Sequence, residues 1–306
     1  MRNQKITSGE HLRANRKWRE KIIELFILCN GILVVAVLIG ILIMLLIQGI
    51  PAFSHTSLWD FFTGTKWYPV SDPPTFGVLT FFISTIVVTI IATVLAIPLG
   101  VGCAIYLAEI AKPKIRETVK PLIELLAGIP SIVMGVIGLA LLTTVVRETF
   151  NLNTGLCGLT AGIILAFMSV PIVVSISEDA LSTVPGEFRE ASYALGATKW
   201  QTIVHVCVPA ALSGITAAIM LGIGRAIGET MTVLMVAGGA IALNFSPLEP
   251  MRPMTAVIAA EINNAVRDGA QYHALFAIGL ALFILTFFVN LAADLVLERQ
   301  RRKFAR

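Results

Sequence analysis

Long stretches without a charged side chain alternate with short polar segments along this chain. Leu25–Ile47 carries no charge over 23 residues, and a helix of that length, at about 1.5 Å per residue, crosses a hydrocarbon core of about 30 Å. Phe76–Ala108 is uncharged over 33 residues. Further candidate spans are Leu125–Val146, Leu156–Ser177, Ile203–Gly224 with its continuation Thr230–Leu243, and Ala274–Ala293. The pattern predicts an all-α integral membrane protein with about six transmembrane helices.

Composition supports this class. Hydrophobic residues make up 56% of the chain and charged residues 14%, which is too apolar for a soluble domain. The first apolar stretch is longer than the core of a cleaved signal peptide, so we expect it to remain as the first span.

The positions of lysine and arginine predict the orientation, because cytoplasmic loops carry most of these residues. With six spans and both termini in the cytoplasm, 18 of the 23 basic residues lie on the cytoplasmic side. These are Arg2, Lys5, Arg13, Arg16, Lys17, Arg19, Lys21, Lys112, Lys114, Arg116, Lys120, Arg189, Lys199, Arg299, Arg301, Arg302, Lys303 and Arg306. Two full spans within Ile203–Leu243 would place the C-terminal bases outside. We therefore expect one long bent span there, or a span followed by a re-entrant turn. The net charge of +4 reflects this orientation and requires no nucleic-acid partner.

A short polar segment, Glu190–Pro209, separates two apolar stretches on the cytoplasmic side. Its sequence is EASYALGATKWQTIVHVCVP. Pro185 and Gly186 open a short helix with acidic residues in its first turn, where the helix dipole favours them. Small and apolar side chains follow, then Gly196 permits a turn, and Pro209 marks the start of the next span. Helix pattern alone fits an ordinary amphipathic connector equally well.

A second polar group, LGIGRAIGETM (Leu221–Met231), interrupts an apolar stretch. On a helix, Arg225 and Glu229 are four residues apart and can neutralise one another. Charges at this depth face a polar cavity or a partner, and a guanidinium binds phosphate-like oxyanions well. One interpretation is therefore a polar gate for an anion, which also uses Thr230. The alternative is an ion pair that only joins helices.

The sequence Gly128-Ile129-Pro130-Ser131 lies in the third candidate span. One hypothesis is that it breaks the helix and exposes backbone amides and the Ser131 hydroxyl to a pathway. An ordinary proline kink is the interpretation that we favour.

Several of these segments together resemble a known family. Glu190, Ala191, Gly196 and Pro209 match the EAA loop of ABC importer permeases, with Ser192 in place of the usual second alanine and Ala197 after the glycine. The segments AIPLGVGCAIYLAEIA, PLIELLAGIPSIVMGVIGL, GRAIGETMTVLMVAGG and PMRPMTAVIAAEI resemble PstC-type permeases of phosphate-specific ABC transporters, in the expected order. The similarity covers about Phe76 to Arg302.

The resemblance implies a type I ABC importer permease in the cytoplasmic (inner) membrane. It implies a second, PstA-like permease, two PstB-like ATPase subunits that dock on the EAA loops, and a PstS-like extracytoplasmic phosphate-binding protein. It assigns ATPase coupling to Glu190, Ala191, Ser192, Gly196, Ala197 and Pro209. The substrate pathway would include Arg225, Glu229, Thr230 and Ser131. The chain contains no Gly-x-x-x-x-Gly-Lys-Ser/Thr loop, so ATP hydrolysis would come from the partner.

The domain organisation that we expect has three parts. Residues 1–75 form a cytoplasmic tail, the first span and an outer loop whose aromatics anchor it at the interface. Residues 76–298 form the permease core, with the coupling loop at about 186–209, and residues 299–306 form a basic cytoplasmic tail. Between Asn244 and Ala270, Thr255–Val266 is expected to form a short outer helix.

Other functions remain open at this point. A permease for sulfate, molybdate or phosphonate would keep the EAA loop, and a secondary transporter or channel would need no ATPase. An enzyme acting on lipid phosphate would need a catalytic cluster of His, Asp or Ser, which the sequence does not show. The four cysteines and four histidines are scattered without metal-ligand spacing, so we expect no cofactor.

Overall fold

The computed structural model describes the backbone of residues 4–304 and the side chains of residues 20–293, 295 and 298. The basic residues near both ends of the chain, apart from Lys21, lie outside the described side chains. The helices are α1 (Gln4–Gly49), α2 (Leu58–Thr63), α3 (Leu79–Ile105), α4 (Pro113–Ala127), α5 (Ser131–Ile137), α6 (Thr143–Phe150), α7 (Gly158–Ser182), α8 (Gly186–Ala194), α9 (Lys199–Thr202), α10 (Val208–Gly228), α11 (Met231–Val236), α12 (Met254–Glu261) and α13 (Ala270–Phe304). A 3-10 turn η1 (Ile50–Ser54) and π-helical turns η2 (Tyr106–Ile110), η3 (Gly138–Leu142) and η4 (Ile203–Cys207) connect or extend them. Strands β1 (Trp67–Tyr68) and β2 (Thr75–Phe76) pair antiparallel.

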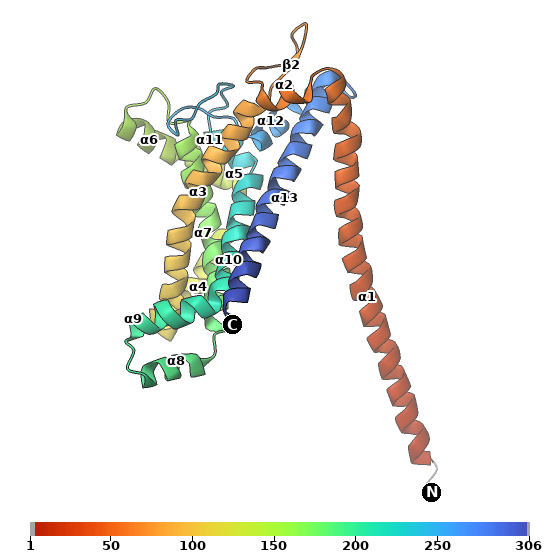
Figure 1. The fold of residues 1–306 in the computed structure, drawn as a ribbon, viewed down its shortest axis with the longest axis vertical. Coiled ribbons are helices and arrows are strands. Elements are labelled where there is room, and N and C mark those ends of the chain that lie inside the picture. Colours follow the sequence, from red (N-terminus) through yellow and green to blue (C-terminus); the bar gives the residue numbers. More distant parts are fainter. Residues whose placement is uncertain (1–3, 305–306) are drawn as a thin grey trace.

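Six helical segments in the described chain are long and apolar enough to cross a membrane. They are Glu20–Ser54, Leu79–Ile110, Ser131–Phe150, Gly158–Ser182, Lys199–Gly228 and Ala270–Ala293. The predicted number of spans is confirmed. In Figure 1, the first described residues of α1 and the last of α13 lie toward the same end of the molecule as α8. We call this the inner end, and the opposite end, with α2, α6 and α12, the outer end.

The centre of the bundle is α7, which packs against α3 and α10 (Figure 1). Small residues allow the close approach that drives helix association in lipid. A Cβ added at Gly162 of α7 would lie 2.5 Å from Ile91 of α3, and one added at Gly222 of α10 would lie 2.9 Å from Val173 of α7. A hydrogen bond from Ser169 Oγ to the Gly222 carbonyl, 3.3 Å long, adds to the α7–α10 contact.

The first span stands apart from the bundle. Figure 1 shows α1 meeting α13 near the outer end and diverging from it toward the inner end. At the contact, a Cβ at Gly49 would lie 3.2 Å from the Ala277 backbone, and His273 Nδ1 lies 2.8 Å from the Gln48 carbonyl. No residue of the most apolar window of this span is buried within the chain, so the bilayer or another protein must cover it.

The outer loop after α1 packs more tightly than an interfacial loop would. Trp59 and Tyr68 are exposed, as expected of aromatics at an interface, but Trp67 is only 1% exposed. The Trp67 indole Nε1 donates to Glu261 Oε2 at 2.9 Å, and Arg252 pairs with the other Glu261 oxygen at 3.0 Å. The prediction of an interfacial anchor was therefore wrong for Trp67, because its indole finds a hydrogen-bond partner inside the outer assembly.

The third span differs from the kinked helix that we favoured. Helix α4 ends at Ala127, and α5 begins only at Ser131, with Pro130 in an extended conformation at its N-cap. The two helices are therefore separate segments, so the helix does break here, immediately before the span, while the exposure of amides and of the Ser131 hydroxyl to a pathway stays a hypothesis. The span itself begins at Ser131 rather than at Leu125, because α4 is a polar-faced helix that packs along the inner part of α7.

The fifth span begins earlier than predicted. Thr198 caps its start with a capping box to Gln201, and the helix runs through α9, η4 and α10 without a break. Pro209 is the second residue of α10, so the prediction that it marks the start of the span was wrong. The π-helical turn η4 just before it accommodates a proline, which has no N–H to donate. The span ends at Gly228, and the short helix α11 follows. The prediction of one span rather than two in this region is confirmed. Residues from 254 form the expected outer helix, α12, which ends at Glu261.

Candidate functional site

Two helices restart side by side within the bundle. The Thr232 hydroxyl at the start of α11 donates to the carbonyl of Ser131 at the start of α5, at 2.8 Å. A Cβ added at Gly135 would lie 3.3 Å from the Thr232 Cα and 2.7 Å from the Met235 sulfur, so the glycine permits this contact. The first amides of both helices lack intrahelical acceptors. The positive ends of the α5 and α11 helix dipoles therefore lie next to each other.

Glu229 lies in the connection between α10 and α11. Its backbone is extended, and its carboxylate Oε1 accepts from the Thr232 amide at 3.3 Å. Its carbonyl accepts from the Thr255 hydroxyl of α12 at 2.8 Å. Thr230 follows, and its hydroxyl donates to the Gly228 carbonyl at 3.3 Å. Glu229 therefore holds the start of α11 to α10 and α12.

The predicted pair between Arg225 and Glu229 does not form among the described residues. The spacing of four residues requires a continuous helix, but α10 ends at Gly228, and the Glu229 side chain turns to α11 instead. Within the same described part of the chain, the Arg225 Nε is buried without a hydrogen-bond partner. The alternative of an ion pair that joins helices is therefore contradicted as well.

Arg225 lines an open groove of about 620 Å³ on the side of the bundle. Helices α7, α10 and α13 form its walls, with Ile172, Ala217, Met220, Leu221, Gly224, Asn290 and Ala293. Apart from Asn290, these neighbours are apolar. No described hydrogen bond or ion pair links Arg225 to the contact between Ser131 and Thr232. The structure thus brings Ser131, Glu229 and Thr230 together at the helix restarts and places Arg225 in a groove of its own.

The segment that resembles the EAA loop forms a helix at the inner end, followed by a turn (Figure 1). Gly196 makes the turn with a φ of +83°, which side chains disfavour. The Ala197 amide donates to the Ser192 carbonyl at 3.2 Å. Glu190 and Ala191 are exposed. The helix ends at Ala194, so Lys199 belongs to the next helix, α9, and not to the helix that contains Glu190.

Ser192 is the one position of this loop that departs from the family pattern. Its hydroxyl is buried and lies 2.9 Å from the Thr202 hydroxyl of α9. The substitution of alanine by serine therefore adds a polar link between α8 and the start of the fifth span. Four large apolar side chains of the loop are exposed: Phe188, Tyr193, Leu195 and Trp200. They belong to α8, to its C-cap and to α9.

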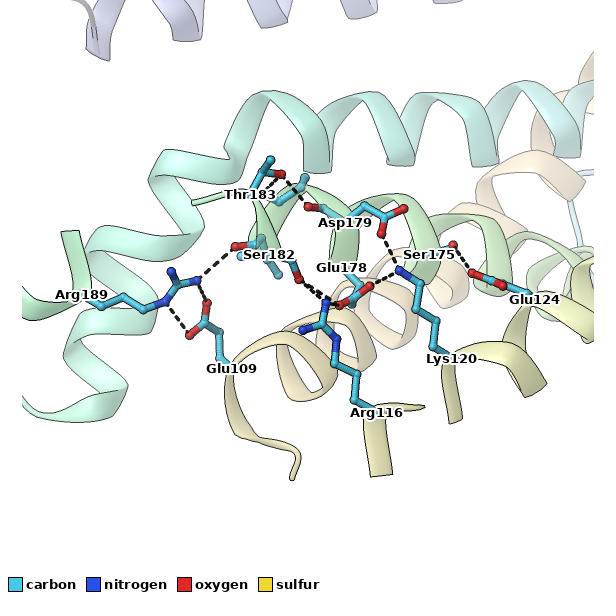
Figure 2. Close-up of polar contacts among 12 residues, drawn as sticks. Glu109, Arg116, Lys120, Glu124, Ser175, Glu178, Asp179, Ser182, Thr183 and Arg189 are labelled. Carbon is cyan, nitrogen blue, oxygen red and sulfur yellow. Dashed lines mark hydrogen bonds and ion pairs between the residues drawn. The ribbon is translucent and has the colours of Figure 1, made fainter. Parts of the chain in front are cut away.

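Figure 2 shows two ion-pair groups at the inner end that the sequence did not reveal. In the first, Arg189 of α8 donates from Nε and Nη2 to both oxygens of Glu109 in η2, at 3.2 and 2.6 Å. Arg189 also donates to the carbonyls of Val184 and Leu181 at 2.7 and 3.1 Å. The hydrogen bonds to Glu109 raise the pKa of Arg189.

The second group surrounds Glu178 of α7, whose side chain is fully buried. Arg116 of α4 forms an ion pair with it, and Lys120 Nζ lies 2.6 Å from its Oε2. Ser182 donates to Oε1 at 2.9 Å, and Lys120 also contacts Asp179 at 2.5 Å. Burial alone would lower the pKa of Lys120, but the hydrogen bonds to Asp179 and Glu178 outweigh it and raise that pKa. The sequence carried one signal of this second group, because Glu178 lies at the end of an apolar stretch and a charge in such a place needs a partner.

The chain is similar to transport permeases over most of its length. The family model described as "Binding-protein-dependent transport system inner membrane component" matches residues 96–304. A probable ABC transporter permease, YqgH of Bacillus subtilis, is 35% identical over 94% of each chain. The phosphate transport system permease PstC of Mesorhizobium japonicum is 35% identical, covering 95% of this chain and 96% of the relative. A PstC of Haemophilus influenzae is 32% identical over 94% of this chain and 96% of the relative.

Solved structures agree on the fold. A bacterial alginate ABC transporter, in complex with a periplasmic protein bound to an alginate pentasaccharide, matches with a TM-score of 0.58 and 15% identity, over 87% of this chain and 94% of the other. An inward-facing MetNI methionine ABC transporter matches with a TM-score of 0.57 and 20% identity, over 73% of this chain and 95% of the other. The fold is that of a type I ABC importer permease. With the match of the family model, these similarities show that the chain belongs to the family of binding-protein-dependent transport system inner membrane components.

Proposed function

We propose that this chain is a permease subunit of an ATP-driven importer of inorganic phosphate in the cytoplasmic (inner) membrane. The relatives named as phosphate transport permeases, at 32–36% identity, support phosphate as the substrate. The observation that carries the proposal is Arg225, whose buried Nε has no partner among the described residues. Arg225 lies in the last turn of its span, and a charge inside a membrane span is costly unless it is paired, so an anion in the groove or on a second subunit would offset this cost.

The helix restarts at Ser131 and Met231 are the second element of the proposed pathway. Helix N-termini in discontinuous spans point at anionic groups in other transporters. Glu229 does not neutralise Arg225 in this arrangement, and its role is to fix the start of α11 through Thr232. Phosphate would therefore interact with Arg225 first through charge, and with Thr230 and Ser131 through hydroxyls and amides.

Phosphate uptake by an Arg225→Gln variant tests the pathway. We expect uptake to fall roughly tenfold or more, because a hydrogen bond to a charged group contributes about 1.5–3 kcal/mol. Arg225→Lys keeps the charge but loses the planar guanidinium, so uptake by this variant should lie between that of the wild type and that of Arg225→Gln. Arg147→Gln is the matched control, since the Arg147 side chain is half exposed at the outer end and its ion pair with Glu148 is its only polar side-chain contact among the described residues. Normal uptake by Arg225→Gln would refute a substrate role for this residue.

Competition by other oxyanions tests the substrate. We expect unlabelled phosphate to abolish uptake of labelled phosphate, while sulfate, molybdate and phosphonate in the same excess leave it in place. Stronger competition by one of the other three would assign the permease to that anion instead.

The exposed face of α8 is the surface that we assign to the ATPase. Glu190, Ala191, Phe188 and Leu195 are all exposed in this segment, and a surface that is both apolar and acidic suits docking into a groove. We assign two PstB-like ATPases, a PstA-like second permease and a PstS-like binding protein as partners. ATP-driven closure of the ATPases would move α8 and rock the attached spans between inward-open and outward-open states.

A Glu190→Lys variant tests this docking. We expect it to reduce copurification of the ATPase and ATP-dependent uptake together, whereas Glu117→Lys, on the exposed face of α4, should leave both unchanged. An ATPase that copurifies equally with both variants would place the docking surface elsewhere.

A further inference from the structure

Helix α8 is held to the rest of the chain by two polar attachments, at Arg189 and Ser192, which lie three residues apart on one face of the helix. The hydrogen bond between Ser192 and Thr202, 2.9 Å long, ties it to the fifth span, which follows it directly. The second attachment is that of Arg189, which reaches Glu109, 80 residues earlier in the chain. Within the described chain, this contact connects α8 to the second span through side chains alone, since no adjacent peptide links the two.

The geometry of Arg189 is that of a clamp between three elements. Its guanidinium makes two parallel hydrogen bonds to Glu109 and two more to the Leu181 and Val184 carbonyls, which end α7. The side chains of Arg189 and Glu109 are 23% and 8% exposed, so solvent screens this pair less than a surface pair. Two-pronged pairs of this kind fix orientation as well as distance.

The connection continues from the end of α7 to α4. Glu178 lies one turn before Ser182, where α7 ends, and it binds Arg116 and Lys120 (Figure 2). Helix α4, which carries both cations, ends at Ala127, just before the break that precedes Ser131. Two groups of charged contacts, joined through the last turn of α7, thus connect the exposed helix α8 with the helix that leads into the proposed pathway.

We propose that Arg189 is a positioning residue for energy coupling, which clamps α8 to the inner ends of α3 and α7 so that these helices and α4 move with it. Glu178 extends the clamped unit to α4, and the break at Gly128–Pro130 is where that unit ends. The proposal rests on the proposed function in one respect, the docking of the ATPase on α8. It assigns to Glu109 and Arg189 a role in transmitting movement rather than in binding phosphate.

Two measurements on the purified, reconstituted complex test the clamp in Glu109→Gln and Arg189→Gln. The first is amide hydrogen exchange in Gly186–Ala194, which should become at least several-fold faster in both variants because α8 loses its attachment to α3. The second is the ratio of phosphate transported to ATP hydrolysed. It should fall roughly tenfold while the ATPase still copurifies and hydrolyses ATP, as expected from loss of a charge-assisted pair.

Matched variants separate coupling from a merely structural role. Glu148→Gln removes the exposed ion pair with Arg147 at the outer end and should change neither measurement. Arg189→Lys keeps one contact to Glu109 but not the pair of parallel hydrogen bonds. The ratio of phosphate transported to ATP hydrolysed should therefore lie between those of the wild type and Arg189→Gln. The exchanged pair Glu109→Arg with Arg189→Glu should recover part of the ratio, because it restores the ion pair but not the bonds to α7.

Unchanged exchange in α8 would overturn the clamp. The clamp would also be overturned if uptake and ATP hydrolysis fell together and their ratio stayed the same, because poor assembly of the complex alone gives that result. A wild-type complex that hydrolyses ATP but imports no phosphate would instead refute the proposed function. In that case the exchange measurement, which needs no substrate, still decides on the clamp.

Discussion

Replacing Glu178 by glutamine removes the charge at the centre of the inner ion-pair group while keeping the size of the side chain. The carboxylate is fully buried and accepts from Arg116, Lys120 and Ser182. Removing one partner of a buried ion pair costs about 3–5 kcal/mol. That figure must be reduced here, because Arg116 is 39% exposed and Lys120 keeps its contact with Asp179 at 2.5 Å.

We therefore expect Glu178→Gln to lower the free energy of unfolding by about 2–3 kcal/mol, since hydrogen bonds to charged groups contribute about 1.5–3 kcal/mol. For a chain of this size, the melting temperature should fall by roughly 5 °C. Thermal unfolding of the purified complex in detergent, followed by scanning calorimetry, measures the shift. Asp179→Asn is the control: its carboxylate binds the same lysine but is 63% exposed, so its loss should cost less than about 1 kcal/mol. Equal destabilisation by the two variants would refute the argument that burial makes Glu178 the centre of the group.

Three further predictions concern pH and packing. Lys120 has a folded pKa above its unfolded value of about 10.5, so its stabilising contribution should be complete below that value and disappear as the pH rises beyond it through the folded pKa. The free energy of unfolding should therefore stay level from about pH 8 to 10 and fall only above about pH 10.5, and Lys120→Gln should abolish this fall. Gly135→Val should force α5 and α11 apart and reduce uptake, at a packing cost of about 1–3 kcal/mol, whereas Gly102→Val, which meets no atom within 4 Å, should transport normally. Ser192→Ala and Thr202→Val should each destabilise the loop by about 1 kcal/mol, and a double variant that costs the sum of the two would contradict a shared hydrogen bond.

The number of spans and the helix and turn at Gly186–Gly196 were predictable because both follow from local sequence. A membrane span needs only length and low charge, and Gly196 alone signals the turn that follows α8. Proline positions were less informative. Pro130 marks a break and Pro209 does not, because the outcome depends on whether a neighbouring turn, such as η4, can accommodate the missing N–H.

The functional contacts were predicted less well, since they depend on where helices end and which helices meet. The spacing of Arg225 and Glu229 predicts a pair only if the helix continues past Gly228. Glu109 and Arg189 lie 80 residues apart, so no local pattern could join them. The contact between Ser131 and Thr232 likewise exists only because α5 and α11 pack side by side.

The tryptophans have a practical consequence for following movement in this protein. Trp67 is buried at the outer end with its indole bonded to Glu261, whereas Trp200 beside α8 is 63% exposed at the inner end. A soluble quencher should therefore reach Trp200 readily and leave the emission of Trp67 intact. With Trp18 and Trp59 replaced by phenylalanine, the two remaining indoles would report separately on the two faces of the membrane. The chain thus carries its own optical probes, one on the side proposed for ATPase docking and one on the opposite side.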